Sequence, residues 1–164
     1  MKKNLAYLIS SSIKKVVGKG AHQLHEPSFS KRELEYVSKT IKTRFVSSAG
    51  KYVNTFEKKF KRYVKSKNAI AVTSGTQAIY ISLLACGVEK DDEVLVPSLT
   101  FVATANAVTY CNATPHFVDI ETSTLGVDAR KLRDYLIKNT KKISGYTVNI
   151  TTGRVIRAMV VMHT

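Results

Sequence analysis

Residues 69–119 read AIAVTSGTQAIYISLLACGVEKDDEVLVPSLTFVATANAVTYCNATPHFVD, and this stretch decides the fold. Short apolar runs typical of buried strands alternate here with longer runs typical of helices. We expect strands at residues 69–72, 93–96 and 116–119, and helices at residues 76–86 and 100–111. Gly87 and Asn112 stand where helix ends favour left-handed residues. The alternation predicts an α/β fold, with a mainly parallel sheet that carries helices on both faces.

Helical segments are expected before this region. Leu5, Ile9 and Ile13 recur at helical spacing among lysines, which predicts a basic amphipathic helix, and we assign residues 1–24 to an N-terminal extension. Such a helix can dock on the rest of the protein, on a partner subunit or on a membrane surface. Ser30 and Glu33 have the spacing of a capping box at the start of the next helix. A third helix follows, for which we expect Asn54 as the cap.

The C-terminal part adds a helix and more strands. Asp128 is expected to cap a helix that runs to about Ile137. Residues 146–150 and 154–162 flank Thr151-Thr152-Gly153, which predicts a hairpin that leads into a long buried strand. The last apolar run has no following helix to cover it, so we expect a truncated protein.

Composition excludes several classes of protein. With 44% hydrophobic and 23% charged residues, the 164-residue chain is neither disordered nor collagen-like. No apolar run approaches the roughly 20 residues of a membrane span. Cys86 and Cys111 are interpreted as buried, unpaired residues of a reducing, cytoplasmic protein. No residues have the spacing of zinc ligands, so no metal is expected.

The formal net charge of +14 is concentrated in one segment. Residues 1–67 hold 17 Lys/Arg and 4 Asp/Glu, whereas residues 68–164 hold 9 and 8. A solvated basic surface accounts for this pattern, and an RNA-binding or membrane-surface patch is the alternative. Because no RNA-recognition motif is present, we expect no nucleic-acid partner.

Two strand-to-helix corners carry the candidate chemistry. Thr73-Ser74-Gly75-Thr76-Gln77 follows the first expected strand and opens a helix, where small residues, hydroxyls and free N–H groups favour a phosphate. The segment lacks the Walker and dinucleotide-binding patterns, and a plain helix cap is the alternative. Phe101 lies at the start of the next helix, where its ring can stack on a flat heteroaromatic cofactor or belong to the core.

Together these corners resemble the DegT/DnrJ/EryC1/StrS family of sugar aminotransferases, which use pyridoxal 5′-phosphate (PLP). The similarity covers roughly residues 25–164, including AVTSGTQAIYISLLACGVEKDDEVLVPSLTFVATANAVTYCNATPHFVDI, FVSSAGKYV and VVMHT. The resemblance implies the N-terminal part of a fold-type-I PLP transferase large domain, a homodimer, a nucleotide-linked 4-keto sugar substrate and glutamate as amino donor. Within the family, the branch of legionaminic-acid-type nonulosonate biosynthesis looks most similar.

The resemblance also implies roles for individual residues. The cofactor phosphate would be bound by Gly75, Thr76 and Gln77, and Phe101 would stack on the pyridine ring. Ser48 and Tyr52 would lie in the loop that reaches the sugar nucleotide. His163 is expected to face the pocket, with no chemical role assigned.

The family's Schiff-base lysine and the aspartate that pairs with the pyridine nitrogen have no counterpart here, so no catalytic residue is assigned. We therefore expect residues 25–164 to form an incomplete large domain that is inactive alone. Two alternatives remain: a same-family sugar dehydratase, and a noncatalytic assembly module that pairs with a full-length subunit.

Overall fold

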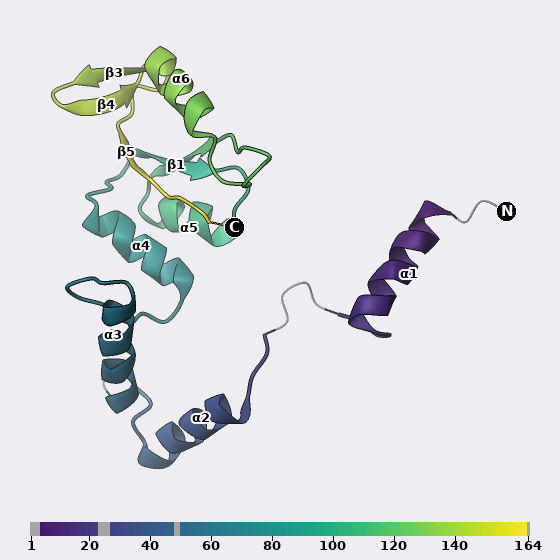
Figure 1. Ribbon diagram of the computed structural model, residues 1–164. Coiled ribbons are helices and arrows are strands. Elements are labelled where there is room, and N and C mark those ends of the chain that lie inside the picture. The colour runs from purple at the N-terminus through teal and green to yellow at the C-terminus, as the bar shows by residue number, and fades with distance from the viewer. Residues whose placement is uncertain (1–3, 23–26, 48–49, 164) are drawn as a thin grey trace. The chain divides into compact units, whose positions relative to one another are not determined.

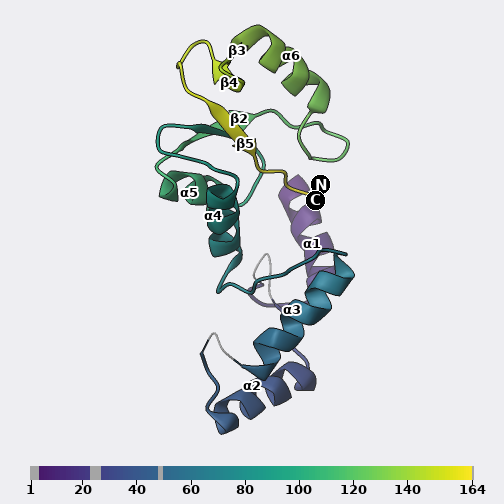
Figure 2. The same cartoon turned by 90° about the vertical axis from the view of Figure 1, so that its left-hand side faces the viewer.

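The computed structural model describes residues 4–22, 27–47 and 50–163, which fall into two compact units, Met1–Lys67 and Asn68–Thr164. The N-terminal unit holds three helices, α1 (Leu5–Val17), α2 (Lys31–Thr43) and α3 (Lys51–Tyr63). The predicted capping box of α2 is confirmed, because Ser30 Oγ accepts from the N–H of Arg32 and Glu33 accepts from the N–H of Ser30. Figures 1 and 2 together label all the elements.

The C-terminal unit is the α/β part of the chain. Its elements are α4 (Gly75–Ala85), β1 (Glu93–Pro97), α5 (Val102–Tyr110), β2 (Thr114–Val118), α6 (Ala129–Asn139), β3 (Thr140–Ile143), β4 (Tyr146–Asn149) and β5 (Ile156–Met159). Strands β2, β1 and β5 form a sheet in that order, and β1 runs parallel to both neighbours. Strands β3 and β4 form a separate antiparallel hairpin.

Helices cover both faces of the sheet, as predicted. Val94 and Val96 of β1 are fully buried and pack with Ala107 and Val108 of α5 and with Leu83 of α4. The intervening residue Leu95 is directed to the other face, since side chains alternate along a strand. There α6 lies over the sheet, on the side opposite α4 and α5 (Figures 1 and 2).

Most elements agree with the sequence prediction. Asp128 caps α6 by accepting from the N–H groups of Arg130 and Lys131. Gly87 and Asn112 have positive φ angles of 75° and 55°, as expected after a helix.

The predicted strand at residues 69–72 is wrong. This segment has no regular secondary structure, and the Ile70 side chain is 84% exposed. An apolar run becomes a strand only when a neighbouring strand receives its backbone hydrogen bonds, and the three-stranded sheet does not include it.

The expected N-cap of α3 is also wrong. Asn54 lies inside the helix and donates its backbone N–H to the carbonyl of Gly50, which is the N-cap. The apolar spacing of Tyr52, Phe56 and Phe60 extends the helical pattern one turn earlier than the prediction.

Two further expectations need correction near the ends of elements. Cys86 is exposed at the end of α4, where the helix leaves the core, although Cys111 is buried and both are free thiols. The chain does turn back after β4, because Val148 and Val155 form an antiparallel bridge. The strand that follows is short, however, and Met159 is 44% exposed, because β5 is paired with β1 on one side only.

Candidate functional site

The start of α4 leaves backbone donors available. Ser74 is the N-cap: its Oγ accepts from the N–H of Gln77 at 3.2 Å, and its carbonyl accepts from the N–H of Ala78 at 3.0 Å. The N–H groups of Gly75 and Thr76 belong to the first turn, where no intrahelical acceptor exists. No acidic side chain lies in that turn, so the positive end of the helix dipole is not offset locally.

Gly75 leaves the approach to these donors open. A Cβ built at this glycine would meet no atom within 4 Å, apart from its chain neighbours and the helix's own backbone. Gln77 is exposed and Thr76 is half-buried, so both side chains retain access to solvent at the helix start. This corner has the donors and the room that a phosphate group requires.

Phe101 lies at the start of α5 as its N-cap residue. Its side chain is 76% exposed, so the ring is not part of the core. The Phe101 carbonyl accepts from the N–H of Thr104 at 3.0 Å, and the Thr100 and Thr104 hydroxyls lie 3.0 Å apart. These contacts fix the backbone at the helix start and leave the ring face accessible for stacking.

The topology brings both helix starts to one edge of the sheet. The loops that leave α4 and α5 are joined at the amino ends of the strands, where the N–H of Asp91 donates to Asn112 O and that of Thr114 to Asp92 O. The helices lie side by side (Figure 1), and the ring centroids of Tyr80 and Tyr110 are 6.2 Å apart. Since β1 and β2 are parallel, both helices begin toward the carboxyl edge, where ligands bind in α/β sheets.

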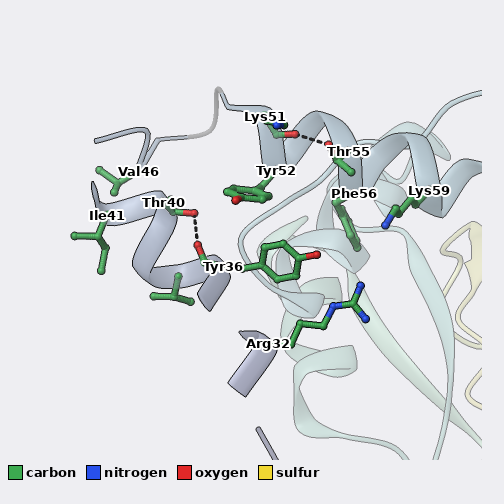
Figure 3. A pocket seen from close by; sticks show the side chains of 11 residues that line it. Arg32, Tyr36, Thr40, Ile41, Val46, Lys51, Tyr52, Thr55, Phe56 and Lys59 are labelled. Carbon is green, nitrogen blue, oxygen red and sulfur yellow. Dashed lines mark hydrogen bonds between the residues drawn. The ribbon is translucent and has the colours of Figure 1, made fainter. Parts of the chain in front are cut away.

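The two residues expected to bind substrate belong to the N-terminal unit. Ser48 lies outside the described residues. Tyr52 contacts the ring of Tyr36 edge-on, with ring centroids 5.2 Å apart, in a groove of about 840 Å³ between α2 and α3 (Figure 3). The Arg32 guanidinium lies 5.9 Å from the Tyr36 ring centre and lowers the pKa of that tyrosine, first through a side-chain hydrogen bond and then through its charge.

His163 is exposed and lines a different groove. This hollow of about 620 Å³ lies between α6 and the chain around β5, and its apolar lining includes Leu132 and Met159. The structure therefore places His163 beside a groove, but the residues that line this groove do not include those of the α4 and α5 corners.

A buried carboxylate that the sequence analysis missed lies at the amino edge of the sheet. Glu93 is 3% exposed and accepts hydrogen bonds from Asn149 Nδ2 at 2.9 Å and Thr152 Oγ1 at 2.6 Å, and its Oε2 lies 2.7 Å from Nδ1 of His116. Burial raises the pKa of Glu93, but the three partners outweigh that effect and leave the pKa below its usual value. A glutamate that opens an apolar strand was the available signal, since buried charges require partners.

Within the described residues, no helix is long and apolar enough to cross a membrane. The same part of the chain contains no group of three or more His, Cys, Asp or Glu side chains that could hold a metal ion.

Comparison with known proteins connects this geometry to a family. Residues 27–150 match the DegT/DnrJ/EryC1/StrS aminotransferase family. The chain is similar to the GDP-perosamine synthase of Caulobacter vibrioides, with 44% identity over 117 residues, 71% of this chain and 32% of that protein.

Solved structures agree with this match. A DegT/DnrJ/EryC1/StrS aminotransferase from Brucella abortus superimposes with a TM-score of 0.64 and 28% identity, over 80% of this chain and 32% of the other. A Streptococcus pneumoniae protein solved in its PLP form gives a TM-score of 0.59 and 26% identity, over 69% and 29%. The chain thus spans about a third of the length of the relatives it matches. On the sequence match and the shared α/β fold, the chain belongs to the DegT/DnrJ/EryC1/StrS aminotransferase family.

Proposed function

We propose that the C-terminal unit supplies the PLP-binding corner of an aminotransferase. The enzyme would aminate a nucleotide-linked 4-keto sugar with glutamate as donor, in the cytoplasm and as a homodimer, for surface polysaccharide or nonulosonate biosynthesis. The observation that carries this proposal is the location, at one edge of the sheet, of an uncrowded helix start and an exposed aromatic ring. Similarity to a GDP-perosamine synthase supports the class of substrate.

Each residue of the corner has a distinct task. The N–H groups of Gly75 and Thr76, aligned with the helix dipole, would donate to the phosphate of the cofactor. The side chains of Thr76 and Gln77 would add donors, and the Phe101 ring would lie against the pyridine. PLP, when bound, supplies the electron sink for amino-group transfer. The residues of this corner bind and orient, and none of them has a side chain suited to moving a proton.

Tyr52 and Ser48 are proposed to contact the sugar nucleotide. In support, Tyr52 exposes part of its ring to a groove whose rim carries Arg32, Lys51 and Lys59. Three cations around an apolar floor suit a ligand that combines a flat base with phosphate charges.

Loss of the Thr76 hydroxyl should weaken PLP binding. A hydrogen bond to a charged group contributes about 1.5 kcal/mol at an accessible site, so Thr76→Ala should raise the Kd roughly tenfold. Isothermal titration calorimetry with PLP measures the effect. Thr109→Ala serves as the matched control. It removes an exposed hydroxyl from a different helix, α5, and should leave the Kd for PLP unchanged. Equal affinities for wild type and Thr76→Ala would remove this threonine from the phosphate site.

We infer that these 164 residues do not transaminate on their own. None of them matches the lysine or the aspartate on which the family's chemistry depends. The purified chain, mixed with PLP, glutamate and a nucleotide-linked 4-keto sugar, should release no more 2-oxoglutarate than a mixture without protein. Repeated turnover in this assay would show that a lysine within the chain takes the catalytic place.

A further inference from the structure

Helix α1 combines an apolar stripe with concentrated positive charge, and it lies before the segment that matches the family, which begins at residue 27. Leu5, Ile9, Ile13 and Val16 recur at intervals of three and four residues, and each is more than half exposed. Lys14 and Lys15 lie in the last turn, on the polar side, and Lys19 follows the helix. No residue of the helix is buried.

The charge distribution limits what can cover this stripe. Residues 1–25 contain five lysines and no Asp or Glu, while the rest of the chain carries the remaining +9 of the formal +14. Docking of α1 on residues 26–67, or on α1 of a second copy, would bring like charges together, and residues 68–164, with 9 Lys/Arg and 8 Asp/Glu, have no excess of negative charge to attract the lysines. Nucleic acid would satisfy the lysines but would leave the leucine and isoleucine side chains in water.

We propose that α1 binds the surface of an anionic lipid bilayer. The apolar stripe would enter the boundary between headgroups and acyl chains, and the lysines would contact anionic headgroups, as amphipathic basic helices do. The helix is 13 residues long, too short to span the bilayer, so it would lie in the plane of the surface. This inference does not depend on the proposed aminotransferase function, because PLP takes no part in it.

Sedimentation of the full chain with lipid vesicles tests the proposal. The chain should bind vesicles of phosphatidylcholine mixed with phosphatidylglycerol, and should not bind vesicles of phosphatidylcholine alone. Ile9→Glu/Ile13→Glu should abolish binding, and Lys14→Gln/Lys15→Gln should weaken it tenfold or more. Circular dichroism of each variant shows whether the C-terminal unit remains folded.

The matched control is Lys138→Gln/Lys141→Gln, which removes two exposed charges from the C-terminal unit and should bind like the wild type. The proposal would be overturned if both double lysine variants lost the same amount of vesicle binding while Ile9→Glu/Ile13→Glu bound like the wild type. That result would mean that net charge alone attracts the chain to the vesicles. Failure of the wild type to bind the anionic vesicles would do the same. Tighter binding to RNA than to vesicles, insensitive to the isoleucine changes, would assign the helix to nucleic acid instead.

Discussion

Gly75→Asp should weaken the binding of PLP about a hundredfold while leaving the C-terminal unit folded. The new carboxylate would lie beside the phosphate, and repulsion of this kind at about 4 Å near a protein surface costs roughly 3 kcal/mol or more. The fold should tolerate the change, because an added Cβ meets no atom within 4 Å and an acidic residue stabilises a helix start. Calorimetric titration with PLP gives the affinity, and thermal unfolding gives the stability.

Gly75→Asn separates charge from size in this experiment. Asparagine has nearly the shape of aspartate without its charge, so its loss of affinity should be less than tenfold. Similar weakening by both substitutions would point to steric exclusion. If neither substitution changes the Kd, the start of α4 does not bind the phosphate.

Glu93→Ala should destabilise the C-terminal unit by about 2–3 kcal/mol, a substantial part of the total stability of a domain. The substitution removes the shared acceptor of Asn149, Thr152 and His116, three side chains from β4, the following turn and β2. Asn149 is 4% exposed, so its side-chain amide would remain buried without this acceptor, whereas Thr152 is exposed and its hydroxyl can bond to water. Urea unfolding followed by circular dichroism measures the loss, and Glu89→Ala, at an exposed site, should change stability by less than about 0.5 kcal/mol.

The same carboxylate predicts a pH dependence. Because the folded-state pKa of Glu93 is lowered, its contribution is present above the unfolded-state pKa and is lost as the pH falls through the folded-state value. In Glu93→Gln, the free energy of unfolding should therefore fall less steeply as the pH is lowered. This milder variant remains informative if Glu93→Ala does not fold. A loss below about 1 kcal/mol in Glu93→Ala, or an unchanged acid profile in Glu93→Gln, would contradict the structural role of Glu93.

Features set by a few neighbouring residues could be predicted from the sequence. The capping box at Ser30 acts within one turn, and the left-handed residue Asn112 follows from the end of a helix. The parallel sheet was also accessible, since strands and helices alternate between residues 93 and 118. In each case the residues that decide the structure are close together in the chain.

Features that depend on distant partners could not be predicted in this way. The segment at residues 69–72 has the composition of a strand, but pairing with another strand decides the outcome. Glu93 was missed because its partners Asn149 and Thr152 lie 56 and 59 residues away. The β3–β4 hairpin was not predicted, although the dipeptide Ser144-Gly145 is a local turn signal; both residues have positive φ angles in the structure, as two-residue hairpin turns require.

The candidate site also combines features that the local sequence predicts with features that depend on packing. Gly75 at a helix start and Phe101 at the next one were predicted from their positions after apolar runs, and both do begin or cap helices. The exposure of the Phe101 ring could not be derived, because a phenylalanine beside a strand serves a core equally well. Only the packing of α4 and α5 against β1 decides that the ring is left outside.

Nuclear magnetic resonance of the ¹⁵N-labelled chain tests the PLP corner most directly. Added PLP should shift the backbone amide signals of Gly75, Thr76 and Gln77 together with that of Phe101, and pyridoxal, which lacks the phosphate, should leave the first three in place. Shifts confined to the α2–α3 groove, or equal responses to PLP and pyridoxal at the start of α4, would contradict the assignment of this corner to the cofactor phosphate.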